Sequence, residues 1–390
     1  MHLATGRIGG AKLAAVNLAS AQLDSGLDAI TITNDSTRTF YRMKSKITTA
    51  IQQLWQVDPY IVSAHSSSQV NLKKIISLNP DVIHVHNWFN LISVKNILQL
   101  GQMYPMVFSL HDERLLTGGC HLTYGCNEFA NECVNCPAVC IAKGRIHKSS
   151  KEMKSSLANI SRLGIVSPSE WLAKKFSLSS IGRGLPKPIV IPNVVPNPDI
   201  NLREKGPKPT DQLRVGFISA NLNEPLKNFK NLAAALELLS FNNPKINFKL
   251  FTAGSGKPLE SKNYQTVRFG ILKPEQMEIF WEEIDVLVVP SLIENFPTVI
   301  AEAAYRSIPV IASAVGGIPE MITHGENGFL VNPSVPSIAS GVSQFLELPI
   351  YKRQRLGENN CRYFHKTFNT GLLVDTYTST YSALIAGKTK

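Results

Sequence analysis

Apolar and polar residues follow two alternating patterns along this chain. Short apolar runs rich in β-branched residues, typical of buried strands in a parallel sheet, are separated by longer segments with helical periodicity. Strands that alternate with helices predict an α/β fold built from βα units. The predicted strands cover residues 29–33, 79–86, 106–110, 165–171, 189–193, 213–219, 248–252, 267–271, 284–289 and 310–312.

A cluster of prolines divides this pattern into two parts. Five prolines fall within the eighteen positions from Pro192 to Pro209, and neither a helix nor a central strand continues through such a segment. We therefore expect an N-terminal domain over residues 1–198 and a second domain over residues 199–370. Residues 371–390 are predicted to contain a final helix whose apolar face is made of Val374, Tyr377, Tyr381 and Leu384.

The chain starts with a very short predicted strand, residues 2–5, followed by the glycine loop of residues 6–10. A glycine loop between a strand and a helix lets a ligand approach the backbone, although a tight turn alone also needs glycine. Because a central strand is usually longer, one explanation is that the chain is truncated at this end. The helix that follows is predicted to place Leu13, Val16, Ser20 and Leu23 on one face.

The main candidate site lies between residues 284 and 331. Glu294 and Glu302 stand between a strand that ends at Pro290 and a helix that we expect to begin within residues 295–298, with Pro297 in its first turn. The free N–H groups and the dipole of that helix favour a phosphate. Glu294 suits neutral sugar hydroxyls, and Glu302 suits a ribose diol. On spacing alone, both are equally well explained as solvated surface residues.

Other polar residues follow predicted strands or precede predicted helices. His84 and His86 alternate with apolar residues, and we interpret them as hydrogen-bonded strand histidines rather than ligands. His111 follows the strand of residues 106–110, where a neutral imidazole suits a hydrogen bond with a sugar hydroxyl. Lys227 stands at the start of a predicted helix, where it would neutralise a diphosphate.

Five of the six cysteines fall within twenty-one positions, in or at the end of an insert at residues 117–140. Two interpretations stay open. A cytoplasmic protein rarely keeps disulfides, and Cys133-x2-Cys136 has the spacing of a metal knuckle, so a structural zinc is one interpretation. The other is a loop of reduced thiols packed as small hydrophobic side chains. The zinc ligands would be Cys120, Cys126, Cys133 and Cys136, or three of these with His121.

Composition indicates a globular chain with an anionic partner. The 390 residues are 44% hydrophobic and 18% charged, with a formal net charge of +11. Residues 143–187 contain ten basic residues but only two acidic ones. One interpretation is that this segment docks on anionic lipid, and the other is that it forms ordinary solvated surface.

No apolar run is long enough to cross a bilayer and the N-terminus lacks a signal-peptide pattern, so we expect a cytoplasmic protein, peripheral on the inner face of the membrane. Nucleic-acid binding patterns are missing.

Several motifs together resemble a known donor-site signature. These are Glu294-x7-Glu302, the preceding Pro290-Ser291, and the Gly316-Gly317-Ile318-Pro319-Glu320 loop. They are similar to those of family 4 glycosyltransferases, which are retaining, nucleotide-sugar-dependent enzymes of the GT-B group. The cysteine insert resembles that of a subset associated with bacterial surface polysaccharides such as lipopolysaccharide. The resemblance covers most of the chain and implies two Rossmann-like domains facing a cleft.

The resemblance also implies a role for each candidate residue. In the second domain, Glu294 would contact the donor sugar and Glu302 the nucleotide ribose. In the first domain, His111 would touch the sugar at the catalytic centre. The other implied contacts are Gly9 and Gly10 toward the acceptor and the donor phosphate, the backbone of Asn295, Phe296, Pro297 and Thr298 on the diphosphate, and the backbone near Ile271 on the base.

Two positions depart from the resembled pattern. The family pairs an arginine with the lysine that corresponds to Lys227, and the arginine's position here is Asn221. The glycine after the lysine is Asn228. Both changes are expected to weaken the phosphate site.

The implied reaction moves a sugar from a nucleoside diphosphate sugar to a polysaccharide or lipid-linked oligosaccharide, with retention of configuration. It requires no metal, so any zinc would be structural. The alternative is a non-catalytic, transferase-like partner that binds a nucleotide or a membrane surface.

Overall fold

The computed structural model describes residues 1–5, 9–34, 54, 56–57, 62, 70–197, 212–244 and 246–387. The chain divides into two compact units. The first contains Met1–Val194 and Thr370–Lys390, and the second contains Val195–Asn369. The boundaries that we expected from the prolines, residues 198 and 370, lie slightly further along the chain.

The first unit is built on a parallel sheet with the strand order β2-β1-β3-β4-β5-β6 among the described residues. All of these strands run in one direction, so their carboxyl ends share one edge. Each is shorter than the apolar run that predicted it. The strands are β1 (His2–Leu3), β2 (Thr31–Ile32), β3 (Ile83–Val85), β4 (Met106–Ser109), β5 (Leu163–Ser167) and β6 (Ile189–Val190).

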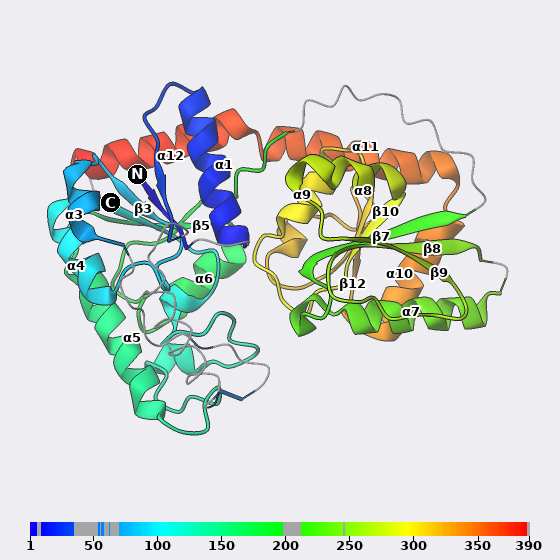
Figure 1. Cartoon of the computed structure of the whole chain (residues 1–390), viewed down its shortest axis with the longest axis horizontal. Helices are drawn as coiled ribbons and strands as arrows, with labels where there is room; N and C mark the ends of the chain where they lie inside the picture. Colours follow the sequence, from blue (N-terminus) through cyan, green and yellow to red (C-terminus); the bar gives the residue numbers. More distant parts are fainter. Residues whose placement is uncertain are drawn as a thin grey trace. The chain divides into compact units, whose positions relative to one another are not determined.

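Helices cover both faces of this sheet (Figure 1). Helices α1 (Gly10–Asp24) and α12 (Thr370–Ile385) pack on one face, where Val107 of β4 and Val166 of β5 belong to their core cluster. The other face carries α3 (Leu72–Ser77), α4 (Val94–Met103), α5 (Lys143–Ala158) and α6 (Glu170–Leu178). The predicted apolar face of the last helix is confirmed, because Val374, Tyr377, Tyr381 and Leu384 are all buried.

The predicted apolar face of α1 is wrong. Leu13, Val16 and Leu23 are exposed, with 44%, 41% and 53% of their surface accessible. The helix instead buries small alanines together with Leu18 and the polar Gln22. Alanines let α1 lie close to its neighbours, and the buried Gln22 has hydrogen-bond partners that hydrophobic periodicity does not reveal.

The second unit is built on a parallel sheet with the strand order β9-β8-β7-β10-β11-β12. This is the 3-2-1-4-5-6 order of doubly wound nucleotide-binding folds, in which the direction of winding reverses between β7 and β10. Val215 and Val286 are register partners at that junction. The strands are β7 (Leu213–Asn221), β8 (Phe248–Ser255), β9 (Gln265–Gly270), β10 (Val286–Val289), β11 (Val310–Ser313) and β12 (Phe329–Val331).

Successive residues of β10 face opposite helix layers, as the period of a strand requires. Val286 and Val288 pack with α7 (Phe229–Asn242) and α10 (Val335–Glu347). Leu287 and Val289 pack on the other side, which α8 (Met277–Glu283), α9 (Thr298–Ala304) and α11 (Ile350–Thr367) cover (Figure 1). Because β10 is buried on both faces, its sequence is a continuous apolar run rather than an alternating one.

Candidate active site

Two loops meet at the carboxyl edge of the second sheet, where the winding reverses. One follows β7 and contains the short turn η3 (Pro225–Lys227), and the other follows β10 and contains Glu294. The backbone N–H of Leu292 donates to the carbonyl oxygen of Leu226 over 2.8 Å, which joins the two loops. Open α/β sheets bind ligands at this position, because diverging loops leave a crevice there.

Lys227 and Glu294 form an ion pair across these loops. The Lys227 ammonium contacts Glu294 Oε1, and the hydroxyl of Ser291 donates to the same oxygen over 3.1 Å. The carboxylate raises the pKa of Lys227, so the ammonium stays charged. The Lys227 side chain is 38% exposed and that of Glu294 is 14% exposed. A cation that is accessible at this crevice is available to an anionic ligand.

A glycine fixes the backbone of Glu294. The N–H of Gly317 donates to the Glu294 carbonyl oxygen over 3.0 Å. Gly316 has a φ of +58°, and a Cβ at this residue would lie 1.7 Å from the same oxygen. Only glycine therefore fits, and the Gly316-Gly317 loop holds Glu294 in place.

Replacing Gly316 with alanine is expected to displace Glu294. The matched control is Gly325→Ala, because Gly325 also has a positive φ, +80°, but an added Cβ there meets no atom within 4 Å. The control should lose about 1 kcal/mol of stability through backbone strain alone. Gly316→Ala should lose several times more in thermal unfolding and should weaken nucleotide binding. Equal losses in the two variants would contradict the role of close packing.

Asn228 takes the conformation that glycine would supply. It has a φ of +59°, and asparagine enters the left-handed region more readily than most residues. Its side-chain amide donates to the carbonyl oxygens of Pro290 and Pro333, both over 2.9 Å. The substitution therefore keeps the turn after Lys227 and ties it to the loop after β10, while its expected effect on phosphate binding stays a prediction.

Asn221, in contrast, brings no charge to the site. It ends β7, is exposed, and its side-chain oxygen accepts a hydrogen bond from the N–H of Asn223 over 3.0 Å. This is a local turn contact. Ile271, the predicted neighbour of the base, follows β9 directly and is 70% exposed.

The helix near Glu294 begins at the last of the four residues expected to start it. Helix α9 begins at Thr298, with Pro297 as its N-cap, so Asn295 and Phe296 belong to the preceding loop. Pro297 has an extended ψ of 108°, which keeps it outside the first turn. The helix thus begins within residues 295–298, as predicted, but the placement of Pro297 in its first turn is wrong. Lys227, rather than this seven-residue helix, supplies the main positive charge here.

Glu302 lies inside α9 and is largely shielded from solvent. Burial raises the pKa of its carboxyl group, while a hydrogen bond with Thr298 and the nearby Arg306 act in the opposite direction. Arg306 donates to the Glu302 backbone oxygen over 2.7 Å, and its guanidinium pairs with Glu278. Arg306 therefore binds the backbone of Glu302 and the carboxylate of Glu278, and the Glu302 carboxylate stays available for a ligand.

In the first unit, His111 lies just after β4, as predicted. Burial lowers its pKa to about 4, so the imidazole is neutral near pH 7. Its Nε2 lies 2.9 Å from Nδ1 of His86. His84 also has two partners, Tyr381 and Ser109, at 2.7 and 2.8 Å. The prediction that His84 and His86 are hydrogen-bonded is confirmed, although only His84 belongs to β3 and His86 directly follows it.

Gly9 and Gly10 stand at the start of α1. Gly9 is its N-cap and Gly10 its first residue, and both are exposed. A Cβ added to either would meet no atom within 4 Å. The structure thus leaves room for a side chain at both, and their contact with a ligand stays a prediction.

The insert cysteines are free thiols that lie close enough to influence one another. Burial raises the pKa of Cys133 to about 12, and neighbouring thiols add to the rise. The N–H of Gly118 donates to Cys133 Sγ over 3.3 Å, and that of Glu128 to Cys126 Sγ over 3.4 Å. Such hydrogen bonds also support metal-bound thiolates. In the described part of the chain, however, the trio whose ligand atoms all lie within 4.8 Å of one another is His2, His84 and His86.

Zinc binding by Cys120, Cys126, Cys133 and Cys136 therefore stays a prediction. Elemental analysis of the purified protein should find one zinc per chain, and Cys133→Ser should lose it. Cys361→Ser is the matched control, because Cys361 is a buried thiol of the second unit. A protein without zinc, whose thiols all react with a thiol reagent after unfolding, would favour the packed-thiol interpretation.

The basic segment of residues 143–187 is partly neutralised by acidic partners. Lys154 and Lys151 lie 3.0 and 3.9 Å from Glu132. Lys175 donates to the fully buried Glu113 over 2.7 Å. The positive surface is thus smaller than composition suggests. No described helix combines the length and the apolar character needed to cross a membrane.

Known proteins are similar to this chain in sequence and in fold. Residues 199–362 match the family model of glycosyl transferases group 1. The chain is 28% identical over 287 residues to an uncharacterized glycosyltransferase of Methanocaldococcus jannaschii, a match that covers 68% of this chain and 66% of that protein. It is 25% identical over 294 residues to the putative colanic acid biosynthesis glycosyl transferase WcaC of Escherichia coli, covering 67% and 69%. The chain thus spans only about two thirds of these relatives.

Solved structures establish the fold. A sucrose-phosphate synthase from Thermosynechococcus elongatus superposes with a TM-score of 0.65 and 16% identity, covering 99% of this chain and 98% of that one. Anabaena Alr3699/HepE, in complex with UDP and glucose, gives a TM-score of 0.60 at 16% identity, with 98% of both chains covered. The chain has the GT-B fold, as predicted, with two parallel sheets in α/β units. The fold and the matched domain together support a GT-B glycosyltransferase.

Proposed function

We propose that this protein is a retaining glycosyltransferase of family 4 that uses a nucleoside diphosphate sugar as its donor. The observation that carries the proposal is the Lys227–Glu294 pair, which lies where the winding of the second sheet reverses. That position suits a nucleotide, and the pair combines a cation for phosphate with a carboxylate for sugar hydroxyls. The family match over residues 199–362 supports the same assignment.

The pair has a direct chemical use in this reaction. Breaking the bond between the sugar and the diphosphate places negative charge on the leaving group, and a positioned ammonium stabilises that charge. When the diphosphate binds Lys227, Glu294 loses its partner and becomes free to accept hydrogen bonds from the sugar. Glu302 accepts hydrogen bonds from the ribose, and the backbone of Asn295, Phe296, Pro297 and Thr298 contacts the diphosphate.

The first unit is assigned to the acceptor. His111 is neutral and suits a hydrogen bond with a hydroxyl of the donor sugar at the catalytic centre, whereas Gly9 and Gly10 are exposed and open to the acceptor. The relative named for colanic acid biosynthesis supports a polysaccharide or lipid-linked glycan as the acceptor. Exposed basic residues, such as Lys143 of α5 and Lys174 of α6, would hold the protein at the anionic inner face of a membrane.

A binding panel followed by a transfer assay tests the proposal. UDP-, GDP- and dTDP-glucose are each added to the protein, and one of them is expected to raise the melting temperature. The transfer product should keep the anomeric configuration of the donor, which NMR coupling constants report. Glu294→Gln should reduce the effect of the nucleotide sugar more than that of the nucleoside diphosphate alone. No shift with any member of a panel widened to other sugars would contradict the proposal.

The alternative was a non-catalytic partner that binds a nucleotide or a membrane surface. The relatives and neighbours are named as transferases or synthases, which gives this alternative no support. A thermal shift without turnover of any donor would be its signature.

A further inference from the structure

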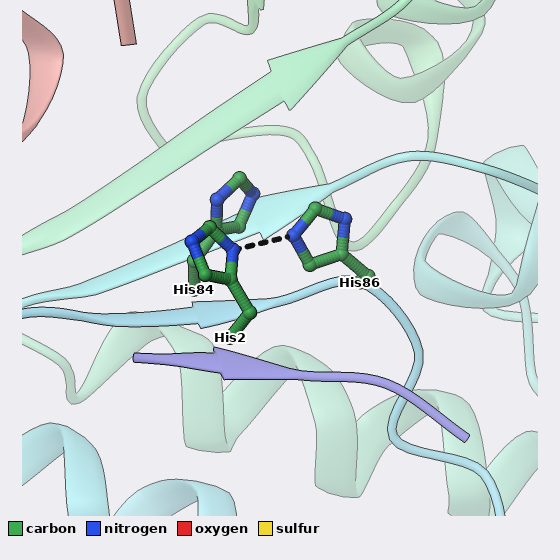
Figure 2. Close-up of side chains that lie close together, drawn as sticks. All are labelled: His2, His84 and His86. Carbon is green, nitrogen blue, oxygen red and sulfur yellow. Dashed lines mark hydrogen bonds between the residues drawn. The ribbon is translucent and has the colours of Figure 1, made fainter. Parts of the chain in front are cut away.

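Hydrogen bonds connect His111 to the interior of the first unit through two further histidines. Nε2 of His111 lies 2.9 Å from Nδ1 of His86, and Nε2 of His86 lies 3.0 Å from Nδ1 of His2. Nε2 of His2 lies 2.7 Å from the side-chain oxygen of Gln22. Figure 2 shows the ring of His2, on β1, joined to that of His86, which directly follows β3, with His84 beside them.

In each of these hydrogen bonds, the donor and the acceptor can be assigned. The side-chain oxygen of Gln22 only accepts, so Nε2 of His2 carries the hydrogen. A neutral imidazole has a single N–H, and burial lowers the pKa of His2 to about 4 and that of His86 well below its usual value. Nδ1 of His2 therefore accepts from Nε2 of His86. By the same step, Nδ1 of His86 accepts from Nε2 of His111.

A second set of bonds is compatible with this orientation of the Gln22 amide. Its nitrogen lies 3.4 Å from the hydroxyl of Tyr381, and that hydroxyl lies 2.7 Å from Nδ1 of His84. Nε2 of His84 lies 2.8 Å from the Ser109 hydroxyl. In this arrangement the amide nitrogen donates to Tyr381, Tyr381 donates to His84, and His84 donates to Ser109. Each donated hydrogen then has one acceptor. The oxygen of Gln22 then faces His2, as the first set requires.

The same three histidines have ligand atoms within 4.8 Å of one another, which would also suit a metal ion. Both ring nitrogens of His2, His84 and His86 already have protein partners. A metal would have to break several of these bonds in a site where His2, His84 and His86 are at most 4% exposed. The cluster is better explained as a hydrogen-bonded network.

We infer that this network holds His111 in the tautomer that carries its hydrogen on Nε2, so that its Nδ1 is a hydrogen-bond acceptor for a sugar hydroxyl. Within the described part of the chain, no group occupies that nitrogen, and the His111 side chain is only partly buried. Gln22, His2 and His86 are thus positioning residues that determine specificity. The identity of the ligand rests on the proposed function, but the tautomer does not.

The first test needs no ligand. The ¹⁵N chemical shifts of labelled histidines in the unliganded protein at pH 7.5, with His111→Gln to assign its signals, should show an unprotonated Nδ1 and a protonated Nε2 for His111. The opposite tautomer, or fast exchange between the two, would overturn the inference. Neither result affects the nucleotide panel, so failure of the inference is separate from failure of the proposed function.

The second test asks whether the network acts on sugar recognition or only on the stability of the fold. Gln22→Met removes the acceptor that sets the direction of the chain, and Asn17→Leu is the matched control. Asn17 is buried on the same helix but donates to Val194 instead. With whichever of UDP-, GDP- or dTDP-glucose gives the largest thermal shift, Gln22→Met should lower kcat/KM about tenfold, the value of one hydrogen bond. Its affinity for the nucleoside diphosphate alone should stay at that of the control. An equal loss in both variants would overturn the inference.

Discussion

Lys227→Met is expected to lower kcat by about 10²–10³-fold, because the variant loses the cation that stabilises the departing diphosphate. Methionine keeps most of the length and the apolar part of the lysine side chain, so the change is mainly one of charge. Glu294 then lacks its ion-pair partner, while the hydroxyl of Ser291 still donates to its Oε1. The measurement is single-turnover transfer at saturating donor, with thermal unfolding recorded in parallel.

Lys230→Met is the matched control. Lys230 lies one turn further along the chain, is exposed, and carries the same charge, so it reports the effect of net charge alone. It should keep nearly full activity. The double variant Lys227→Met with Glu294→Gln completes the comparison. If the pair were only a stabilising ion pair, the two single variants would lose stability together, and Lys227→Met would turn over at the rate of Lys230→Met.

The positions of Lys227 and Glu294 at one edge of the sheet were predictable, because these candidate residues lie in two short loops directly after apolar strands. Such strands are recognisable from their continuous apolar runs, and the parallel order brings their carboxyl ends to one edge. The sequence did not reveal that Lys227 and Glu294 contact each other, since they are 67 positions apart. Nor did it reveal that Asn228 adopts a left-handed conformation, because asparagine is also common in right-handed turns.

The histidine network was not predictable for a related reason. Its members are brought together by contacts between distant segments, such as Gln22 with Tyr381, which are 359 positions apart. Hydrophobic periodicity placed the wrong face of α1 in the core, because that face carries larger apolar residues than the alanine-rich face that packs. Helix α11 was also missed, since its sequence is predominantly polar and only residues such as Leu356 and Phe364 mark its buried side.

The first unit is expected to lose stability at a higher pH than most globular proteins when the solution is acidified. Burial lowers the pKa of His2 to about 4 and those of His84 and His86 well below 6.5. In the unfolded chain each of these histidines titrates near 6.5, so between that pH and about 4 the unfolded state binds protons that the folded state does not. The stabilisation is therefore complete above pH 6.5 and is lost as the pH falls toward 4.

The expected loss is large. For His2, with a folded pKa of about 4, the stability at pH 5 is roughly 2 kcal/mol lower than at pH 7.5. The lowered pKa values of His84 and His86 add to this loss in the same direction. A domain is stable by only about 5–15 kcal/mol, so the combined loss is a large part of the total. Urea denaturation at pH 7.5, 6 and 5 measures it. Trp281 is the one tryptophan of the second unit, so Trp281→Phe leaves fluorescence that reports on the first unit alone. His86→Gln should give a shallower pH dependence, because one titrating ring is gone. A stability that stays constant from pH 7.5 to 5 would mean that the folded unit accepts protons at these rings, and the neutral hydrogen-bonded network that orients His111 would then be wrong.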